Sequence, residues 1–365
     1  MQLLKFELYK IFKQKIIYIT FILLMIFSTG FTFYHKSDMS DGIYKQWEGT
    51  LTEEKIEQAE IENAKIIEKQ DALETGQYFS ETELIRMGIY ETIAMAENAQ
   101  RNVEQRLIEL KKENNYNTDL EKSILSKVDV SYFAYNQGPE KIIDFASIFS
   151  ILLTGAILLL GLSTIYTQEY SSGVDNYMLS AKKGRRSLMW SKVAASLIYT
   201  TSVVAAWELF NIFWNVIQFG NDGWSTAIQY YFKYYFSPYG FNMLEYHLLQ
   251  LGFHLLAAYS FALLILLVSS LCKNALISLI INGAIFSIPY LIVETLMMPN
   301  WIEDVFHFSF IYMMNVEFFF DQFRTINLFG IPILYPILAI VCMVVIASVF
   351  VVLTTRVVKN REVTT

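Results

Sequence analysis

Few residues of this chain have the types and spacing that catalysis needs. The four histidines lie far apart, and neither they nor the cysteines and acids form a cluster with metal-ligand spacing (His35, His247, His254 and His307). No G-x-x-x-x-G-K-[ST] motif occurs, so the chain has no P-loop with which to hold nucleotide phosphates. No nucleophile and base stand out as a pair. The sequence therefore predicts a protein that is not an enzyme and that binds no cofactor or metal of its own.

Two titratable residues lie inside long apolar runs. Glu208 is the only charge between residues 193 and 218, and His254 lies within residues 246–272. A charge inside a bilayer costs several kcal/mol unless it is paired or hydrated, which makes such residues functional candidates. For Glu208, two alternatives stay open: a role in a transport pathway or dimer interface, and a structural carboxylate satisfied by its neighbours. His254 is a candidate for the same pathway or interface, or for a hydrogen bond between helices.

Long apolar runs determine the architecture that must position these residues. The 365 residues are 54% hydrophobic and only 17% charged, whereas soluble domains have about 25% charged residues. Several runs approach or exceed the roughly 20 residues that cross a bilayer as a helix. We expect an all-α polytopic membrane protein with six transmembrane helices, at residues 16–34, 143–168, 193–218, 246–272, 275–294 and 325–355.

The segments around these runs have distinct compositions. Residues 1–15 form a basic amphipathic pattern, predicted to be a helix at the cytoplasmic membrane surface. Residues 35–142 are acidic, and they contain two helical patterns separated by a short break at Thr75 and Gly76. These patterns predict an extracytoplasmic helical hairpin domain. The remaining segments are predicted to be a cytoplasmic loop, an aromatic-rich outer loop, an outer re-entrant or interfacial segment and a cytoplasmic tail (169–192, 219–245, 295–324 and 356–365).

The basic residues predict the orientation. If the N-terminus is cytoplasmic, the inner segments hold thirteen Lys and Arg residues, whereas the short outer segments hold only Lys233 and Arg324. Such a bias marks the cytoplasmic side. We therefore expect both termini in the cytoplasm of a bacterium, with the chain in its plasma membrane. The net charge of -7, concentrated in the predicted outer domain, argues against a nucleic-acid partner.

The cytoplasmic segment at residues 169–192 carries the most informative pattern. The second apolar run leads directly into Glu169 and, four residues later, Gly173. An apolar residue, a basic turn and a lysine at the start of the third run follow (Leu179, Arg185 and Lys192). With the amphipathic N-terminal helix and the six-span layout, this segment resembles the permease subunits of ABC-2 type exporters. The resemblance covers the spans and loops but not residues 35–142. Family members often have Gly-Thr and a proline in this loop, whereas here Val174 follows Gly173 and no proline occurs.

The resemblance implies a function and partners. The loop would be a coupling helix that docks on a separate cytoplasmic ABC ATPase subunit, which binds ATP and magnesium, through Glu169, Gly173, Tyr177 and Leu179. A second permease chain and membrane lipid would complete the assembly, and the substrate would be amphipathic or hydrophobic. The alternative is a membrane-anchored sensor or scaffold whose outer helical domain binds a ligand or partner without transport. The two differ in whether an ATPase binds the loop.

Overall fold

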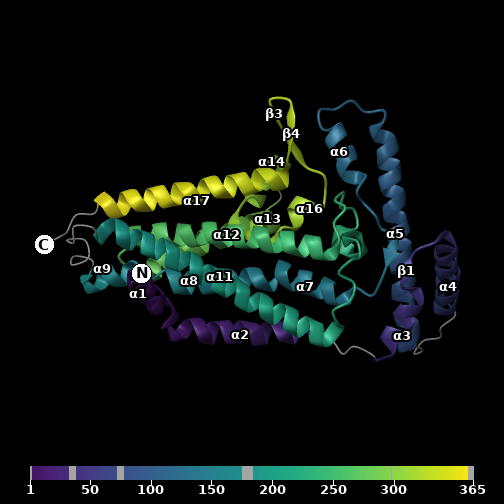
Figure 1. The fold of residues 1–365 in the computed structure, drawn as a ribbon, viewed down its shortest axis with the longest axis horizontal. Helices are drawn as coiled ribbons and strands as arrows, with labels where there is room; N and C mark the ends of the chain where they lie inside the picture. Colours follow the sequence, from purple (N-terminus) through teal and green to yellow (C-terminus); the bar gives the residue numbers. More distant parts are fainter. Residues whose placement is uncertain (1, 33–37, 72–77, 175–183, 297, 361–365) are drawn as a thin grey trace.

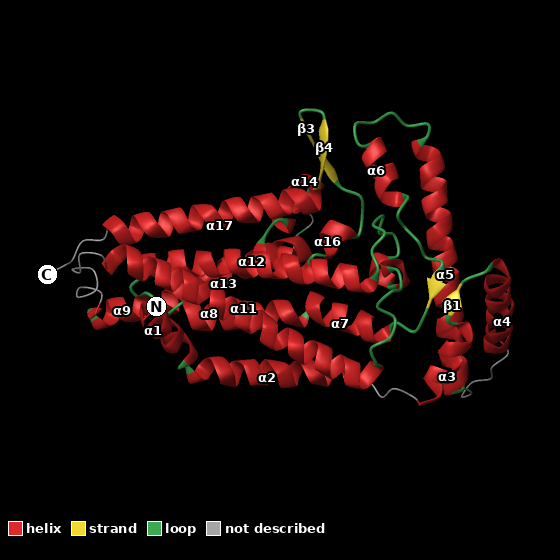
Figure 2. Ribbon diagram, viewed as in Figure 1, coloured by secondary structure: helices red, strands yellow, loops and turns green. Residues whose placement is uncertain are grey.

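Long helices dominate the structure, a computed structural model that describes residues 2–32, 38–71, 78–174, 184–296 and 298–360 (Figures 1 and 2). Within these residues, five helical segments are long and apolar enough to cross a membrane. The first is a run of three consecutive helices, α7 (Gln137–Ser147), α8 (Phe149–Leu162) and α9 (Thr167–Ser172). The others are single helices: α11 (Gly184–Phe219), α12 (Met243–Leu271), α13 (Ala275–Thr295) and α17 (Tyr335–Asn360).

Two N-terminal helices supply a candidate sixth span. α1 (Gln2–Phe12) and α2 (Lys15–Thr32) are bent by 54° at the break between them, and together they pass the same test of length and composition. Eighteen residues of α2 extend about 27 Å at 1.5 Å per residue, close to the thickness of the hydrocarbon core. The described chain is therefore mostly helical, and its long apolar helices fit a multi-pass membrane protein, while the number of six spans stays a prediction.

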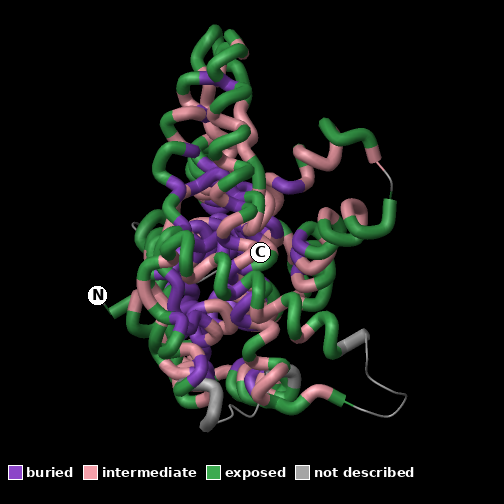
Figure 3. The backbone as a smooth tube through the Cα atoms, turned by 90° about the vertical axis from the view of Figure 1, so that its right-hand side faces the viewer, coloured by how far each residue is buried: buried purple, intermediate pink, exposed green. Residues whose placement is uncertain are grey.

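The long helices run side by side, and α12 occupies the centre of the bundle (Figure 1). Its neighbours include α8, α11, α13 and α17, and most of its second half is buried. Buried segments gather in the middle of the molecule (Figure 3). Both termini lie at one end of the bundle, which we call the terminal end, and we call the opposite end the domain end (Figure 1).

A small helical domain lies at the domain end (Figure 1). It contains α3 (Asp38–Trp47), α4 (Glu53–Asp71), α5 (Glu81–Leu110) and α6 (Thr118–Leu125). α4 packs against α5 as the predicted helical hairpin, and apolar residues of α5 at helical spacing are buried (Ile89, Ile93, Ala96 and Ala99). Thr75 and Gly76, where the break was predicted, lie outside the described residues. A two-stranded antiparallel sheet, β1 (Gly49–Thr50) and β2 (Tyr132–Phe133), completes the domain.

Between α11 and α12 the chain forms two short 3-10 helices, η1 (Ile228–Tyr230) and η2 (Phe232–Tyr234). After α13 come three short helices, α14 (Asn300–His307), α15 (Phe310–Asn315) and α16 (Glu317–Phe320). α15 packs against α12 and α13 and buries most of its side chains. The mixed polarity of residues 295–324 thus corresponds to short helices, with α15 packed within the bundle.

A β-hairpin precedes the last long helix, where residues 325–355 were expected to form a span with a short lead-in. β3 (Thr325–Leu328) pairs with β4 (Ile331–Leu334), and α17 begins only at Tyr335. Phe329 and Gly330 both have positive φ, which is the two-residue turn that follows the twist of a hairpin. Asn327 Oδ1 accepts a hydrogen bond from the Gly330 amide at 2.7 Å. The all-α description therefore needs two small sheets added.

Candidate functional site

Four charged side chains meet at the terminal end, where α1, α9 and α11 come together. Lys192 Nζ donates to Glu169 Oε1 at 2.7 Å and to Glu7 Oε2 at 3.0 Å. Lys10 Nζ contacts the same two carboxylates, at 2.5 Å from Glu169 and 3.4 Å from Glu7. Glu7, Lys10, Glu169 and Lys192 thus form a group of two positive and two negative charges, here named the terminal charge cluster.

Burial makes this cluster energetically important. Glu7 and Lys192 are fully buried, and Glu169 is 5% exposed. Lys192 also donates to the carbonyl oxygen of Ile165 at 3.0 Å, and its Nζ lies 4.9 Å from the centre of the Tyr166 ring. A buried charge is tolerated only when it is paired and hydrogen-bonded. The cluster therefore holds α1, the end of the second predicted span and the start of α11 in one arrangement.

The structure brings together two residues of the predicted coupling segment, Glu169 and Lys192. Gly173 ends α9 with φ of 69°, a left-handed conformation that glycine adopts without strain. Tyr177 and Leu179 lie outside the described residues. The predicted loop at residues 169–192 is partly helical, because α11 begins at Gly184 and runs without a break into the predicted third span.

Sequence reasoning missed Glu7 and Lys10, although the pattern of α1 contains a signal for the first. Leu4, Glu7, Leu8 and Ile11 follow the i, i+3, i+4, i+7 spacing of one helix face. An acid on the apolar face of a basic amphipathic helix needs a buried cation. Lys192 provides that cation 185 residues further along the chain, and this pairing is visible only in the folded molecule.

A groove opens beside the cluster at the terminal end, which we call the terminal groove. Its volume is about 480 Å³, and α1, α9 and the residues next to them line it (Phe6, Tyr9, Lys10, Lys13, Gln14, Gln168, Glu169, Ser172 and Val174). Tyr9 is 60% exposed and Phe6 is 49% exposed. Lys10 and Glu169 belong to both the groove and the cluster, so a partner seated in the groove would contact the charges that join the three helices.

Glu208 lies in a hydrogen-bonded chain inside the half of the bundle near the domain end. Its Oε1 lies 2.8 Å from His247 Nε2, and its Oε2 accepts a hydrogen bond from Asn211 at 3.2 Å. His247 Nδ1 lies 3.2 Å from Gln250 Oε1, and Gln250 in turn donates to Ser147. Both ring nitrogens of His247 therefore have an oxygen atom within hydrogen-bonding distance. The sequence alone did not predict the contact between His247 and Glu208, which lie 39 residues apart.

His254, the second intramembrane candidate, has other partners. Its Nε2 lies 2.8 Å from Thr154 Oγ1, and Trp207 Nε1 donates to the same hydroxyl at 3.1 Å. Its Nδ1 lies 3.4 Å from Ser150 Oγ and 3.4 Å from the carbonyl oxygen of Met314. His254 thus links α12 to α8 and α15. Glu208 and His254, predicted as possible parts of one pathway or interface, each have a satisfied hydrogen-bond environment of their own.

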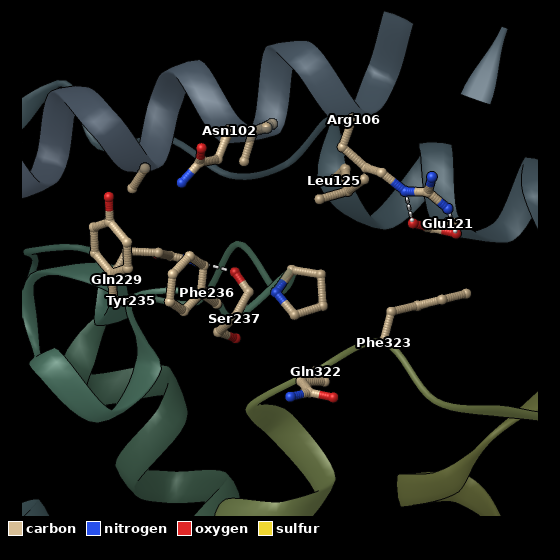
Figure 4. Close-up of a pocket in the computed structure, with 13 residues that line it drawn as sticks. Asn102, Arg106, Glu121, Leu125, Gln229, Tyr235, Phe236, Ser237, Gln322 and Phe323 are labelled. Atoms are coloured by element: carbon tan, nitrogen blue, oxygen red, sulfur yellow. Dashed lines mark hydrogen bonds and ion pairs between the residues drawn. The ribbon is translucent and has the colours of Figure 1, made fainter. Parts of the chain in front are cut away.

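A pocket of about 250 Å³ lies at the domain end, between α5, α6, η1 and the loops that follow η2 and α16 (Figure 4). Its wall is largely apolar and aromatic, with residues such as Val103, Leu125 and Phe323. On one side, Arg106 pairs with Glu121, and this hydrogen bond raises the pKa of Arg106. Gln229 is almost completely buried, and its Oε1 has no hydrogen-bond partner. The pocket thus combines a largely apolar wall with an ion pair on one side.

These sites are suited to docking and positioning. Among the residues that the structure describes, no three His, Cys, Asp or Glu side chains are grouped to hold a metal ion. Their chemistry consists of ion pairs, hydrogen bonds and apolar contacts. Comparisons of the chain with protein-family models, with curated proteins and with solved structures found no match.

Proposed function

We propose that this chain is the permease subunit of an ABC-2 type exporter. The observation that carries the proposal is the terminal charge cluster. It joins the N-terminal helix, the segment after the second predicted span and the first turns of α11 through buried ion pairs. A permease driven by a separate ATPase needs such a junction, because the force arrives at one surface and has to move several helices together.

The terminal groove is the proposed docking surface for the ATPase subunit. Exposed aromatic rings of Phe6 and Tyr9 offer apolar contact area, while Lys10, Lys13 and Glu169 offer charge. Aromatic residues are common energetic centres of protein interfaces. In this proposal the terminal end faces the cytoplasm of a bacterium, in agreement with the excess of Lys and Arg in the segments assigned to that side.

ATP and magnesium would be bound by the partner, and closure of two ATPase subunits would push on the groove of each permease chain. The cluster would pass this movement to α1, α9 and α11, and so change the side to which the pathway between two permease chains opens. The cargo would be an amphipathic or hydrophobic molecule. The domain of α3–α6 would then lie outside the membrane, at the exit of the pathway.

The test is purification of the tagged protein from its native host in mild detergent, followed by mass spectrometry. Three forms are compared: the wild type, Tyr9→Asp in the groove, and Tyr78→Asp at the domain end. Tyr78 is 89% exposed, so it is a matched exposed tyrosine. We expect a P-loop ATPase with the wild type and Tyr78→Asp, and several-fold less with Tyr9→Asp. If no form retains an ATPase under conditions that preserve a known ABC complex, the proposal is wrong.

The pocket at the domain end favours the second candidate function, a sensor or scaffold without transport. Its largely apolar wall would suit a ligand with an apolar surface. Leu125→Trp would fill this pocket and leave the terminal groove unchanged. If the chain is a sensor, Leu125→Trp should abolish its response to the ligand and Tyr9→Asp should leave that response unchanged. If the chain is an ATP-driven permease, Tyr9→Asp should abolish transport.

A further inference from the structure

The β3–β4 hairpin presents an apolar tip that no other part of the described chain covers. Phe329 at the turn is 98% exposed, and its neighbours Ile331 and Leu328 are 65% and 49% exposed. Residues 325–334 carry no charge. An exposed aromatic and aliphatic cluster of this kind marks a surface that meets an apolar partner.

The position of the hairpin relative to α17 shows at what depth in the membrane that partner lies. Leu334 ends β4, and Tyr335 begins α17, whose 26 residues extend about 39 Å and so exceed a hydrocarbon core of about 30 Å. The hairpin therefore leaves the bundle near one surface of the membrane. Tyr335 fixes its base, because the Tyr335 amide donates to the carbonyl oxygen of Arg324 at 3.1 Å and its hydroxyl donates to Asp304 at 3.1 Å.

The hairpin also projects sideways beyond α17, away from the bundle (Figure 1). Whatever covers the outward face of α17 therefore lies beside and beneath the tip. That face carries branched aliphatic side chains (Ile337, Ile340, Val341, Val344, Val345, Val349 and Val352). α17 contains no glycine, whereas contacts between membrane helices favour glycine and other small or polar residues. The composition of the α17 face thus favours lipid as its neighbour.

Helix α14 supports the same assignment. Trp301 is 70% exposed and Val305 is 64% exposed, and Asp304 of this helix holds the base of the hairpin through Tyr335. Tryptophan is enriched where a membrane meets water. α14 and the hairpin therefore each present exposed apolar side chains near the start of α17.

We infer that the β3–β4 hairpin is a lipid anchor, with its tip inserted among the headgroups and upper acyl chains of the leaflet at the domain end. Phe329, Leu328 and Ile331 supply apolar area to that boundary. This role does not depend on transport or on an ATPase. It does require that α17 crosses the bilayer.

The test places an environment-sensitive fluorophore at the tip. A variant without reactive thiols, Cys272→Ser with Cys342→Ala, receives one new cysteine as Phe329→Cys, which is labelled with NBD and reconstituted in phosphatidylcholine vesicles. Two other single-cysteine forms are controls: Val345→Cys on the exposed face of α17, and Tyr78→Cys in the helical domain. Spin-labelled lipids with shallow or deep doxyl groups report contact with lipid, and iodide reports contact with water.

For a lipid anchor, the label at position 329 emits at shorter wavelength than the label at 78. It is quenched severalfold more strongly by shallow than by deep doxyl lipid, and it is protected from iodide. Quenching by iodide to the level of position 78 would overturn the assignment. Protection from both quenchers would overturn it in favour of a protein neighbour, such as a second copy. A label at 345 that deep doxyl lipid does not quench would remove the premise that α17 spans the membrane.

Discussion

Lys192 is the residue on which the terminal charge cluster depends, because it contacts both buried carboxylates. Its Nζ has Glu7, Glu169 and the Ile165 carbonyl within 3.0 Å, and the side chain is inaccessible to solvent. Removing one partner of a buried ion pair is far more costly than never having the pair, since it leaves the other charge uncompensated. The cluster is therefore sensitive to single substitutions and tolerant of neutralisation as a whole.

Lys192→Met is expected to lower the free energy of unfolding by about 3–5 kcal/mol, because Glu7 would stay buried with only a weak contact to Lys10. The measurement is the thermal unfolding midpoint in detergent. Lys273→Met is the control, since Lys273 is exposed. The triple variant with Glu7→Gln and Glu169→Gln should recover part of the loss. A Lys192→Met protein as stable as the wild type would show that the cluster contributes no structural coupling.

The contacts of Glu208 favour the structural alternative for this carboxylate. The two carboxylate oxygens of Glu208 contact Asn211 and His247, whereas the amide of Glu208→Gln has a single oxygen. We therefore expect Glu208→Gln to lower the free energy of unfolding by about 1–3 kcal/mol, and Glu208→Ala to lower it further. Thermal unfolding of both variants and of His247→Ala measures this order. If Glu208→Gln unfolds like the wild type but abolishes transport, the carboxylate acts in the pathway instead.

At the scale of elements, close packing between α8 and α11 holds the bundle near the terminal charge cluster. Gly161 of α8 faces Tyr199 of α11, and a Cβ at position 161 would lie 2.5 Å from the tyrosine oxygen. Tyr199 is buried and donates to the carbonyl oxygen of Ile157 at 2.9 Å. The Gly161 carbonyl also accepts a hydrogen bond from Gln14, next to α1. The small residue thus allows three helices to approach one another.

Gly161→Ala should destabilise the protein by about 1–3 kcal/mol through overpacking against Tyr199. Gly252→Ala is the matched control in α12, because a Cβ there meets no atom within 4 Å. The free energy of unfolding of Gly252→Ala should rise by about 0.5–1 kcal/mol, because alanine favours a helix more than glycine does. Unfolding midpoints in the same detergent measure both. Equal midpoints for the two variants would contradict the close approach of α8 and α11.

Apolar length and helical spacing predicted most of the long elements, but not their ends. The spans follow from apolar runs, and the α4–α5 hairpin follows from residues at helical spacing, both of which a sequence displays directly. The start of α11 at Gly184 was missed, because a run of basic residues at a membrane surface does not distinguish a loop from a helix. The β3–β4 hairpin was missed because ten uncharged residues beside an apolar helix extend its pattern, although Pro332 and the Phe329–Gly330 turn interrupt the helix.

The candidate site was predictable only in part. Glu169 and Lys192 were identified by resemblance, and the intramembrane position of Glu208 was visible from the length of its run. Glu7 and His247 were not, because each depends on a partner far along the chain. Pairings of this kind are set by the packing of helices, which no local pattern encodes.

At the scale of the whole molecule, both termini, the terminal charge cluster and the terminal groove lie at one end, and the helical domain lies at the other (Figure 1). The proposed permease uses this separation: the ATPase would act at the terminal end, and the cargo would leave near the domain end. The β3–β4 hairpin, at the domain end of α17, would fix the bundle in the membrane while its opposite end moves.

The central claim is that an ATPase docks in the terminal groove, and photo-crosslinking in intact cells of the native host tests it most directly. A benzoylphenylalanine replaces Tyr9 in one variant and Tyr78 in the other. We predict that irradiation joins the Tyr9 variant to a P-loop ATPase, identified by mass spectrometry, and that the Tyr78 variant gives no such product. Absence of an ATPase adduct at Tyr9, or an equal adduct at Tyr78, would contradict the proposed docking surface.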